Sequence, residues 1–165
     1  MLVQEEPTLS WHDNLELEWT DFKAEPEVHA DVIAVTASGL SFGYSTTRYS
    51  DGSLDYDFTV TAHFYPERSY YLKEHVTEVT LAHERLHFDI TELHARKFRQ
   101  RVERTSFSSS TINEQMDAIY QEINAELKKM QYQYDAETSH SRIEDKQMVW
   151  QKFVALELKK LEQFM

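Results

Sequence analysis

The spacing of apolar residues predicts a long helix in the middle of the chain. Between about Glu74 and Arg104 the sequence contains no Gly or Pro, the two residues that most readily interrupt a helix. Apolar side chains recur in this segment at steps of three and four residues, so they fall on one face that is expected to meet a core. This stripe consists of Val76, Val79, Leu86, Ile90 and Phe98.

Two further amphipathic helices are predicted towards the carboxy terminus. The segments Thr111 to Glu114 and Ser141 to Glu144 both match the capping box, in which a hydroxyl and an acidic side chain three residues later begin a helix. The periodic pattern stops between Tyr134 and Ser141, so a loop is predicted to join the two helices there. The apolar stripe of the first helix is expected to be core: Ile112, Met116, Ile119, Ile123, Leu127, Met130 and Tyr134. The final amphipathic helix is defined by Trp150, Phe153, Val154, Leu158 and Leu161.

The preceding half of the chain is predicted to form strands. It is rich in β-branched and aromatic residues and contains all three glycines. Asp51-Gly52 is a pair that favours a tight hairpin turn, and Pro66 ends the last strand. A strand edge of such a sheet can also bind an extended peptide. The predicted strands are residues 15–19, 32–36, 40–49 and 54–65.

Together these elements predict an α+β fold. A chain of 165 residues is long enough to bury a single sizeable core. We expect one domain over residues 1–165, sheet-rich over 9–71 and helical over 74–165. The amino-terminal antiparallel sheet should pack on the central helix, and the two long carboxy-terminal helices should complete the core.

The amino-acid composition limits the classes of partner and the types of metal ligand that are expected. The chain has 17 Lys and Arg against 29 Asp and Glu, and its formal charge of −12 repels phosphate backbones, which argues against nucleic acid. It has no apolar run of membrane-spanning length. It contains no cysteine, so disulfides and sulfur-rich metal sites are excluded and His, Asp and Glu remain as ligands.

The predicted central helix contains the motif His-Glu-x-x-His at residues 83–87. At about 100° and about 1.5 Å per residue, His83 and His87 lie about 40° apart and about 6 Å along the axis, so both imidazoles can bind one ion. Glu84 flanks the pair, where its carboxylate can reach a water on the metal without binding the metal itself. This arrangement of two ligands and one base is typical of zincin-like helices. The alternative is that both histidines are core residues bonded to carbonyl groups.

A catalytic zinc takes three protein ligands, and the motif supplies two. His94 lies on the same helical face, but it is seven residues beyond His87, about 10.5 Å further along the axis. A straight helix cannot bring it to the same ion, so we expect His94 to support the ligands or to line the cleft. The loop predicted between the last two helices offers Asp135, Glu137 and His140 as further candidates.

The sequence around these residues resembles one bacterial family. After His87 it continues as Phe-Asp-Ile, Leu-x-Trp-x-Asp-Phe begins at Leu17, and Tyr-Asp-x-x-Thr-x-His runs from Tyr134 to His140. In this order, over about residues 17–150, the chain resembles a family of predicted secreted zinc-dependent proteases, otherwise of unknown function. The likeness also includes residues 34–39, Glu92, Ala95-Arg96-Lys97, Gln147 and Trp150, and it departs at Ser141, where the family usually has Gly.

The resemblance implies zinc as the cofactor and His140 as the third ligand beside His83 and His87. It also implies an extracytoplasmic location, periplasmic or secreted. Residues 1–6 lack the basic start and the apolar stretch of a signal peptide. We therefore expect either a cytosolic protein or a mature secreted one whose leader is absent.

The predicted function is that of a zinc metallohydrolase, with a peptidase acting on peptide or protein substrates as the leading hypothesis. Glu84 is expected to take a proton from the attacking water and to pass it to the leaving amine. Tyr134 is the candidate donor to the oxyanion. The alternative is a non-catalytic extracytoplasmic module, with a structural or vestigial metal site or a peptide at a sheet edge. A fourth protein ligand would favour that alternative, and the oligomeric state stays open.

Overall fold

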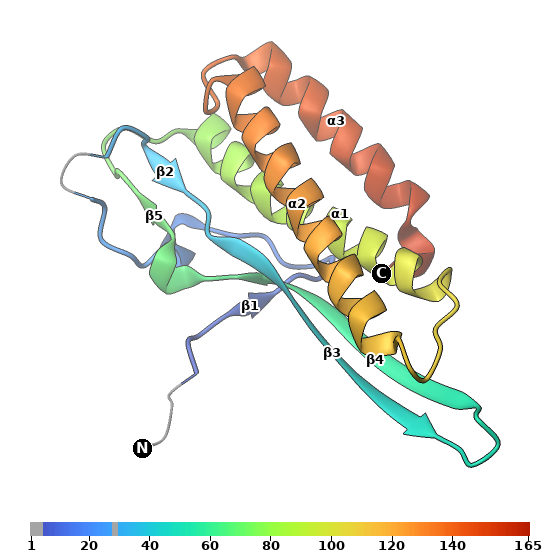
Figure 1. The fold of residues 1–165 in the computed structure, drawn as a ribbon. Coiled ribbons are helices and arrows are strands. Elements are labelled where there is room, and N and C mark those ends of the chain that lie inside the picture. The colour runs from blue at the N-terminus through green and yellow to red at the C-terminus, as the bar shows by residue number, and fades with distance from the viewer. Residues whose placement is uncertain (1–4, 28–29) are drawn as a thin grey trace.

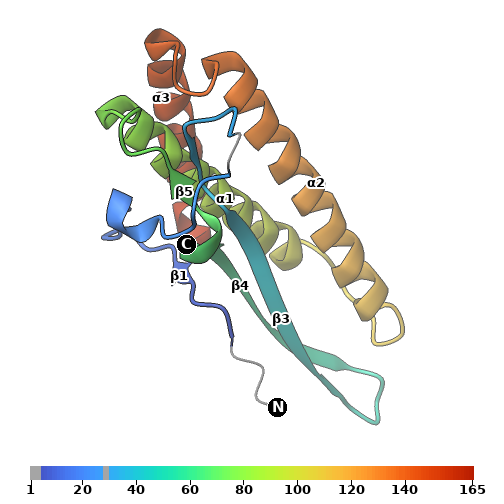
Figure 2. The ribbon, with the colours of Figure 1, turned by 90° about the vertical axis from the view of Figure 1, so that its left-hand side faces the viewer.

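The computed structural model describes residues 5–27 and 30–165, and this part of the chain has the predicted α+β class (Figure 1). Residues 1–4 and 28–29 of the predicted domain lie outside the described residues. The helices lie together against a long β-hairpin, whose tip extends beyond them in both views (Figures 1 and 2). The helices are α1 (Glu78–Glu103), α2 (Ile112–Thr138) and α3 (Glu144–Lys160), and the strands are β1 (Leu9–Ser10), β2 (Ala34–Val35), β3 (Ser38–Arg48), β4 (Leu54–Phe64) and β5 (Tyr70–Tyr71).

The strands form two antiparallel sheets. β4 lies between β1 and β3 in the first sheet, and β2 pairs with β5 in the second. The β3–β4 hairpin turns at Asp51 and Gly52, as predicted, and Gly52 adopts a φ of +88°, which a residue without a Cβ tolerates. The buried side chains of β4 alternate and pack towards α1; they are Val60, Ala62 and Phe64.

α1 is the element against which the others pack, because it contacts β2, β3, β4, α2 and α3. The Thr77 hydroxyl accepts the backbone N–H of Thr80 and caps the first turn. The helix therefore begins at Glu78, slightly after the predicted boundary at Glu74. Three members of the predicted apolar stripe are fully enclosed in the core, namely Leu86, Ile90 and Phe98.

A buried cluster of ion pairs holds the carboxy-terminal half of α1. Glu92 Oε1 lies 3.0 Å from Arg96 Nε and 3.0 Å from Arg99 Nη1. Arg96 also donates to the Leu158 carbonyl of α3, and Arg99 donates to the Val60 carbonyl of β4. One buried carboxylate thereby orients two guanidinium groups that join α1 to the third helix and to the sheet.

The strand predicted at residues 15–19 does not form. This segment is a loop that leads into a 3-10 turn at Trp19–Asp21. The Leu17 side chain enters the core, but its carbonyl accepts from Arg85 of α1. The alternation of apolar residues therefore reflects burial against a helix. Among the described strands, none forms a hydrogen-bonded ladder with this segment.

The predicted helix start at Thr111 is confirmed, because Thr111 is the N-cap of α2, but the capping-box hydrogen bonds predicted at Thr111 and Ser141 do not form. The Thr111 hydroxyl donates to the Gln115 side chain and caps no backbone group of α2. Ser141 has a φ of 75° and lies in the turn before α3. The N-cap of that helix is Ile143, which has no side-chain oxygen to accept a hydrogen bond.

α2 continues through most of the segment that was predicted to be a loop. Tyr134 and Thr138 are both fully buried one turn apart, and the Thr138 hydroxyl donates to the Tyr134 carbonyl, so the helix ends only at Thr138. The chain then turns at Ser139, His140 and Ser141, whose φ angles of 49°, 52° and 75° are left-handed. Residues with a Cβ adopt this region at some cost, so a strained turn sets the start of α3.

The role of the Glu92 ion pairs in holding α1 can be tested with Glu92→Gln. The substitution leaves two buried guanidinium groups facing a neutral amide, so we expect the free energy of unfolding to fall by about 3 kcal/mol. Urea denaturation followed by circular dichroism gives this value. Glu103→Gln, at an exposed position on the same helix, is the matched control and should change it by less than about 0.5 kcal/mol. Equal effects of the two substitutions would contradict the role assigned to the cluster.

Candidate metal site

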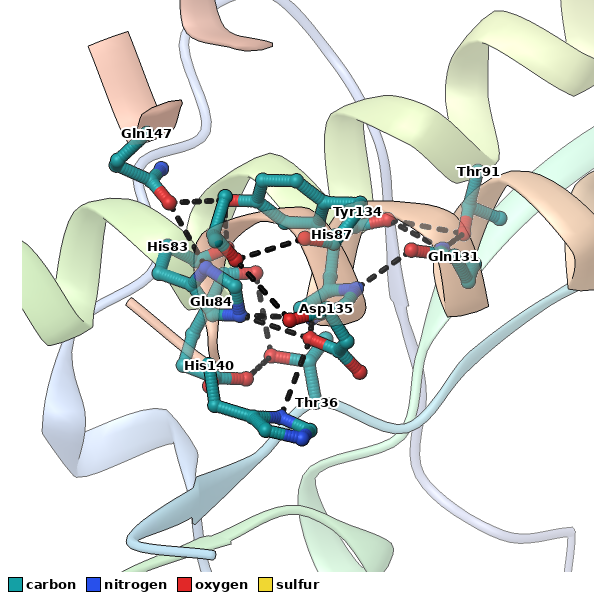
Figure 3. A network of polar contacts seen from close by, with 11 residues as sticks. Thr36, His83, Glu84, His87, Thr91, Gln131, Tyr134, Asp135, His140 and Gln147 are labelled. Atoms are coloured by element: carbon teal, nitrogen blue, oxygen red, sulfur yellow. Dashed lines mark hydrogen bonds and ion pairs between the residues drawn. The ribbon is translucent and has the colours of Figure 1, made fainter. Parts of the chain in front are cut away.

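His83 and His87 meet at their Nε2 atoms. They lie one turn apart on α1, both side chains are buried, and the two Nε2 atoms are 3.1 Å apart. Their rings are nearly perpendicular, at 87°, with centroids 4.8 Å apart. Both nitrogens therefore face the same small space (Figure 3).

Asp135, in the last turn of α2, adds a third candidate ligand atom. Its Oδ1 lies 3.0 Å from His83 Nε2 and 2.9 Å from His87 Nε2. The sequence indicated Asp135 only as one of several candidates in a predicted loop. Because the segment is helical, the side chain is held by α2 and directed at both histidines, so the three atoms form a triangle.

Amide oxygens occupy the other nitrogen of each imidazole. Gln147 Oε1 of α3 lies 2.8 Å from His83 Nδ1. Gln131 Oε1 of α2 lies 2.5 Å from His87 Nδ1, and the Gln131 Nε2 group donates to the His87 carbonyl and the Thr91 hydroxyl, which fixes the orientation of the amide. An amide oxygen only accepts, so each Nδ1 carries the proton and each neutral imidazole presents the Nε2 lone pair to the triangle.

This arrangement fits a bound cation. Three atoms that carry lone pairs repel one another in a buried place unless positive charge lies among them. Donor atoms at about 2.0–2.2 Å from a tetrahedral zinc ion are themselves about 3.3 Å apart. The observed separations of 3.1, 3.0 and 2.9 Å are close to that spacing, so the residues fit a metal ion without rearrangement of the helices.

The electrostatics of the site favour positive charge. Burial by itself lowers the pKa of His87, but the hydrogen bond to Asp135 and the charges of Glu84 and Asp135 raise it above its usual value. Burial by itself raises the pKa of Asp135, but the contacts with His83 and His87, whose rings donate to the carboxylate when they are protonated, outweigh it and hold that pKa well below its usual range. The triangle therefore attracts a proton or a metal ion.

Glu84 faces the same space from α1. It is buried, and its carboxylate lies within 4.8 Å of the ligand atoms of His83 and His87. The Thr36 hydroxyl, between β2 and β3, donates to Glu84 Oε2 at 2.6 Å (Figure 3). Sequence reasoning missed Thr36, because nothing local marks a threonine beside a strand; the family-like segment 34–39 was the only signal in that region.

A cleft of about 230 Å³ opens beside the triangle, between residues 32–38 on one side and α1 and α2 on the other. Glu84, His87 and Asp135 line it. His140, the ligand that the resemblance implies, also lines it and places Nδ1 3.5 Å from Asp135 Oδ1, with 47% of its side chain exposed. The cleft therefore connects the buried triangle with solvent.

Residues 16–141, which include all four of the histidine and aspartate candidates above, match a family described as bacterial proteins of unknown function, DUF922. The chain belongs to the DUF922 family. This confirms the coarser part of the predicted resemblance, a bacterial family without an established function. No curated protein and no solved structure matches the chain. In the part of this DUF922 chain that the structure describes, no helix is long and apolar enough to cross a membrane.

The DUF922 structure does not place Tyr134 for its predicted role as oxyanion donor. The side chain is fully buried, and its ring stacks on the His83 ring with centroids 4.4 Å apart. The hydroxyl donates to Gln147 Oε1 at 2.8 Å, towards α3 (Figure 3). Burial is the main reason that the pKa of this phenol lies far above its usual value. Tyr134 therefore supports the His83 ring from behind.

Two other candidates lie away from the triangle. The Glu137 carboxylate accepts from Trp150 Nε1 at 2.8 Å and from Gln133 Nε2 at 2.7 Å, on the side of α2 that faces α3. His94 is fully buried in the core, and its Nδ1 donates to the Ile90 carbonyl at 2.8 Å. It lies neither beside the ligands nor along the cleft, because a straight α1 carries it away from both.

Asp135 and His140 can be ranked as ligands of the DUF922 site. Asp135 Oδ1 contacts both histidines, so Asp135→Asn should weaken zinc binding by roughly a hundredfold or more, whereas His140→Ala should weaken it by less than about tenfold. A competition titration against a chromophoric chelator measures both. The reverse ranking would make His140 the third ligand, as the resemblance implies.

His94 should make the chain less stable in acid. Burial lowers its pKa to about 4, against 6.5 for an unperturbed imidazole. Between these values only the unfolded state binds the proton, so the free energy of unfolding falls as the pH decreases from about 6.5 to about 4. In urea denaturation with chelator present, the loss between pH 7 and pH 4.5 should be about 2.5 kcal/mol smaller for His94→Leu than for the parent. Equal losses would show that His94 does not contribute.

Proposed function

We propose that this DUF922 chain is a zinc-dependent hydrolase that cleaves peptide bonds. The observation that carries the proposal is the convergence of His83 Nε2, His87 Nε2 and Asp135 Oδ1 within 3.1 Å of one another, beside a buried glutamate and an open cleft. A core histidine pair needs neither the carboxylate nor the cleft. The zincin-like character of the helix and an extracytoplasmic location belong to the same proposal, the latter supported by the family resemblance alone.

Zinc is the metal that the ligand chemistry favours. Two imidazoles and one carboxylate are a common set for catalytic zinc, and the chain has no cysteine for a sulfur-rich site. In the proposed site His83, His87 and Asp135 hold the ion. When bound, zinc supplies a Lewis acid that polarises a carbonyl and makes water a nucleophile near neutral pH.

Glu84 is the general base in this proposal. Its Oε2 is held by the Thr36 hydroxyl, so the direction of the carboxylate is set and the other oxygen is left for the reaction. Glu84 accepts a proton from the attacking water and donates it to the leaving amine. Thr36 keeps the carboxylate in place while the proton moves. His140, at the mouth of the cleft, is the side chain best placed to contact the substrate near the reacting carbonyl.

The wall of the cleft supports an extended polypeptide as the substrate. The backbone N–H of Leu72 donates to the Ile33 carbonyl, and Val35 pairs with Tyr70, so Ile33 and Val35 direct their backbone N–H and C=O groups at β5. Because this direction alternates along a strand, the backbone groups of Ala34 and Thr36 point away from β5. Both residues line the cleft. A substrate strand can therefore add its backbone to this edge while its scissile bond lies over the triangle.

One observation favours the alternative of a structural metal. His140 Nδ1 lies only 3.5 Å from Asp135 Oδ1, which is close to the spacing of two ligands on one ion. If His140 binds as a fourth ligand, the tetrahedral site is closed and has no place for a substrate. The protein would then be a non-catalytic binding module with the same metal stoichiometry.

Glu84→Gln separates the two functions. We expect the variant to keep its fold and one zinc per chain and to lose at least about a hundredfold in hydrolysis of a fluorescence-quenched peptide library. Glu78→Gln, an exposed Glu at the start of the same helix, is the matched control and should keep parental activity. If Glu84→Gln hydrolysed peptides at the parental rate, Glu84 would not be the general base. If the zinc-loaded parent cleaved no peptide, the non-catalytic structural module would be the better explanation of the site.

A further inference from the structure

Gln147 joins α3 to the metal site through two hydrogen bonds. It is 2% exposed, and its Oε1 lies 2.8 Å from His83 Nδ1 and 2.8 Å from the Tyr134 hydroxyl. Tyr134 also stacks on the His83 ring. Gln147 therefore contacts the edge of the His83 imidazole and Tyr134 contacts its face, and neither residue belongs to α1 (Figure 3).

The amide oxygen of Gln147 selects one tautomer of His83. Because Oε1 only accepts, it favours the form of the ring that carries its proton on Nδ1. That form leaves Nε2 bare towards His87 and Asp135. Zinc binds only the bare nitrogen, so the Gln147 contact favours metal binding before any metal arrives.

The amide of Gln147 is paired only through its oxygen. Gln147 Nε2 is buried and has no hydrogen-bond partner among the residues that the structure describes. A buried donor left unpaired costs about 1–3 kcal/mol, whereas Oε1 is the acceptor for the His83 Nδ1–H and the Tyr134 hydroxyl. The acceptor is therefore the part of this side chain that acts on the site.

Gln131 provides an internal comparison. Its Oε1 contacts His87 Nδ1 as that of Gln147 contacts His83 Nδ1. Its Nε2, however, is satisfied by the His87 carbonyl and the Thr91 hydroxyl. The two glutamines thus make equivalent contacts with the imidazoles, but only Gln131 has both the oxygen and the nitrogen of its amide paired.

We propose that Gln147 is a positioning residue that holds His83 in its metal-binding tautomer. A neutral acceptor suits this task, because Glu84 and Asp135 already place two carboxylates at the site. The inference rests on the proposed metal site, but not on catalysis. Its tests therefore measure zinc binding and stability without any substrate.

The decisive variant is Gln147→Met, which keeps the length of the side chain and removes its polar atoms. We expect its zinc affinity, measured by competition with a chromophoric chelator, to fall by about 10- to 100-fold. The melting temperature of the same variant in excess chelator should fall, because the His83 Nδ1–H and the Tyr134 hydroxyl lose their acceptor. Gln131→Met should lose a similar factor in affinity, and its metal-free melting temperature should fall as well.

Gln147→Glu is the rescue variant. It restores an acceptor for His83 Nδ1, so its zinc affinity should lie within about threefold of the parent or above it. Long-range ¹H–¹⁵N spectra of the metal-free proteins report the tautomer directly. His83 should carry its proton on Nδ1 in the parent and lose that preference in Gln147→Met.

Three other outcomes overturn the inference. Unchanged zinc affinity in Gln147→Met would show that the contact does not position His83. A loss of affinity without a change in the His83 tautomer would show an ordinary structural role. A parent that binds no zinc would overturn both this inference and the proposed function, whereas a parent that binds zinc without cleaving peptides would remove only the hydrolase and leave the inference standing.

Discussion

The electrostatic requirement of the triangle is the constraint on which the site depends. Two imidazole nitrogens and a carboxylate oxygen lie within 3.1 Å of one another in a largely buried place. Such a group is unfavourable unless positive charge is present or the neighbours hold it in place. Here Gln131 and Gln147 hold the rings from two other helices. The candidate site is therefore built from an arrangement that folding alone would not favour.

The rest of α1 supplies the rigidity that this arrangement needs. Glu92, Arg96 and Arg99 join its carboxy-terminal half to α3 and β4 through buried ion pairs and carbonyl contacts. His83 and His87 lie in the other half, where α2 and α3 approach. The strained turn at residues 139–141 joins those two helices and so sets the position of Gln147 relative to Asp135. The ion pairs that stabilise α1 thus lie in one half of the helix, and the candidate metal ligands lie in the other half.

The two walls of the cleft have complementary chemistry. One wall is a strand segment that presents backbone groups and the Thr36 hydroxyl, and the other presents the acidic and imidazole side chains of α1 and α2. A backbone edge beside a candidate metal site suits a long, regular ligand such as a polypeptide better than a compact metabolite. This supports the peptidase proposal over other hydrolase classes. Binding of the ion by His140, which lies half-exposed at the mouth, would close the site, whereas an unbound His140 would leave it open for a substrate.

The sequence by itself determined the parts of this protein that depend on near neighbours. Helical periodicity and the His-Glu-x-x-His spacing predicted that His83 and His87 lie together, and Asp51-Gly52 predicted the hairpin, because these features follow from backbone geometry over a few residues. Tertiary packing was needed to show that residue 135 is helical and faces both histidines, that the Tyr134 hydroxyl points to α3, and which amides hold the rings. The contacts of the two imidazoles with α2 and α3 join residues 44 to 64 positions apart, and the Tyr134 hydroxyl contacts Gln147, 13 positions away across a turn. Apolar periodicity indicates which face of a helix is buried, but which neighbour meets that face is decided by how three helices pack around one core.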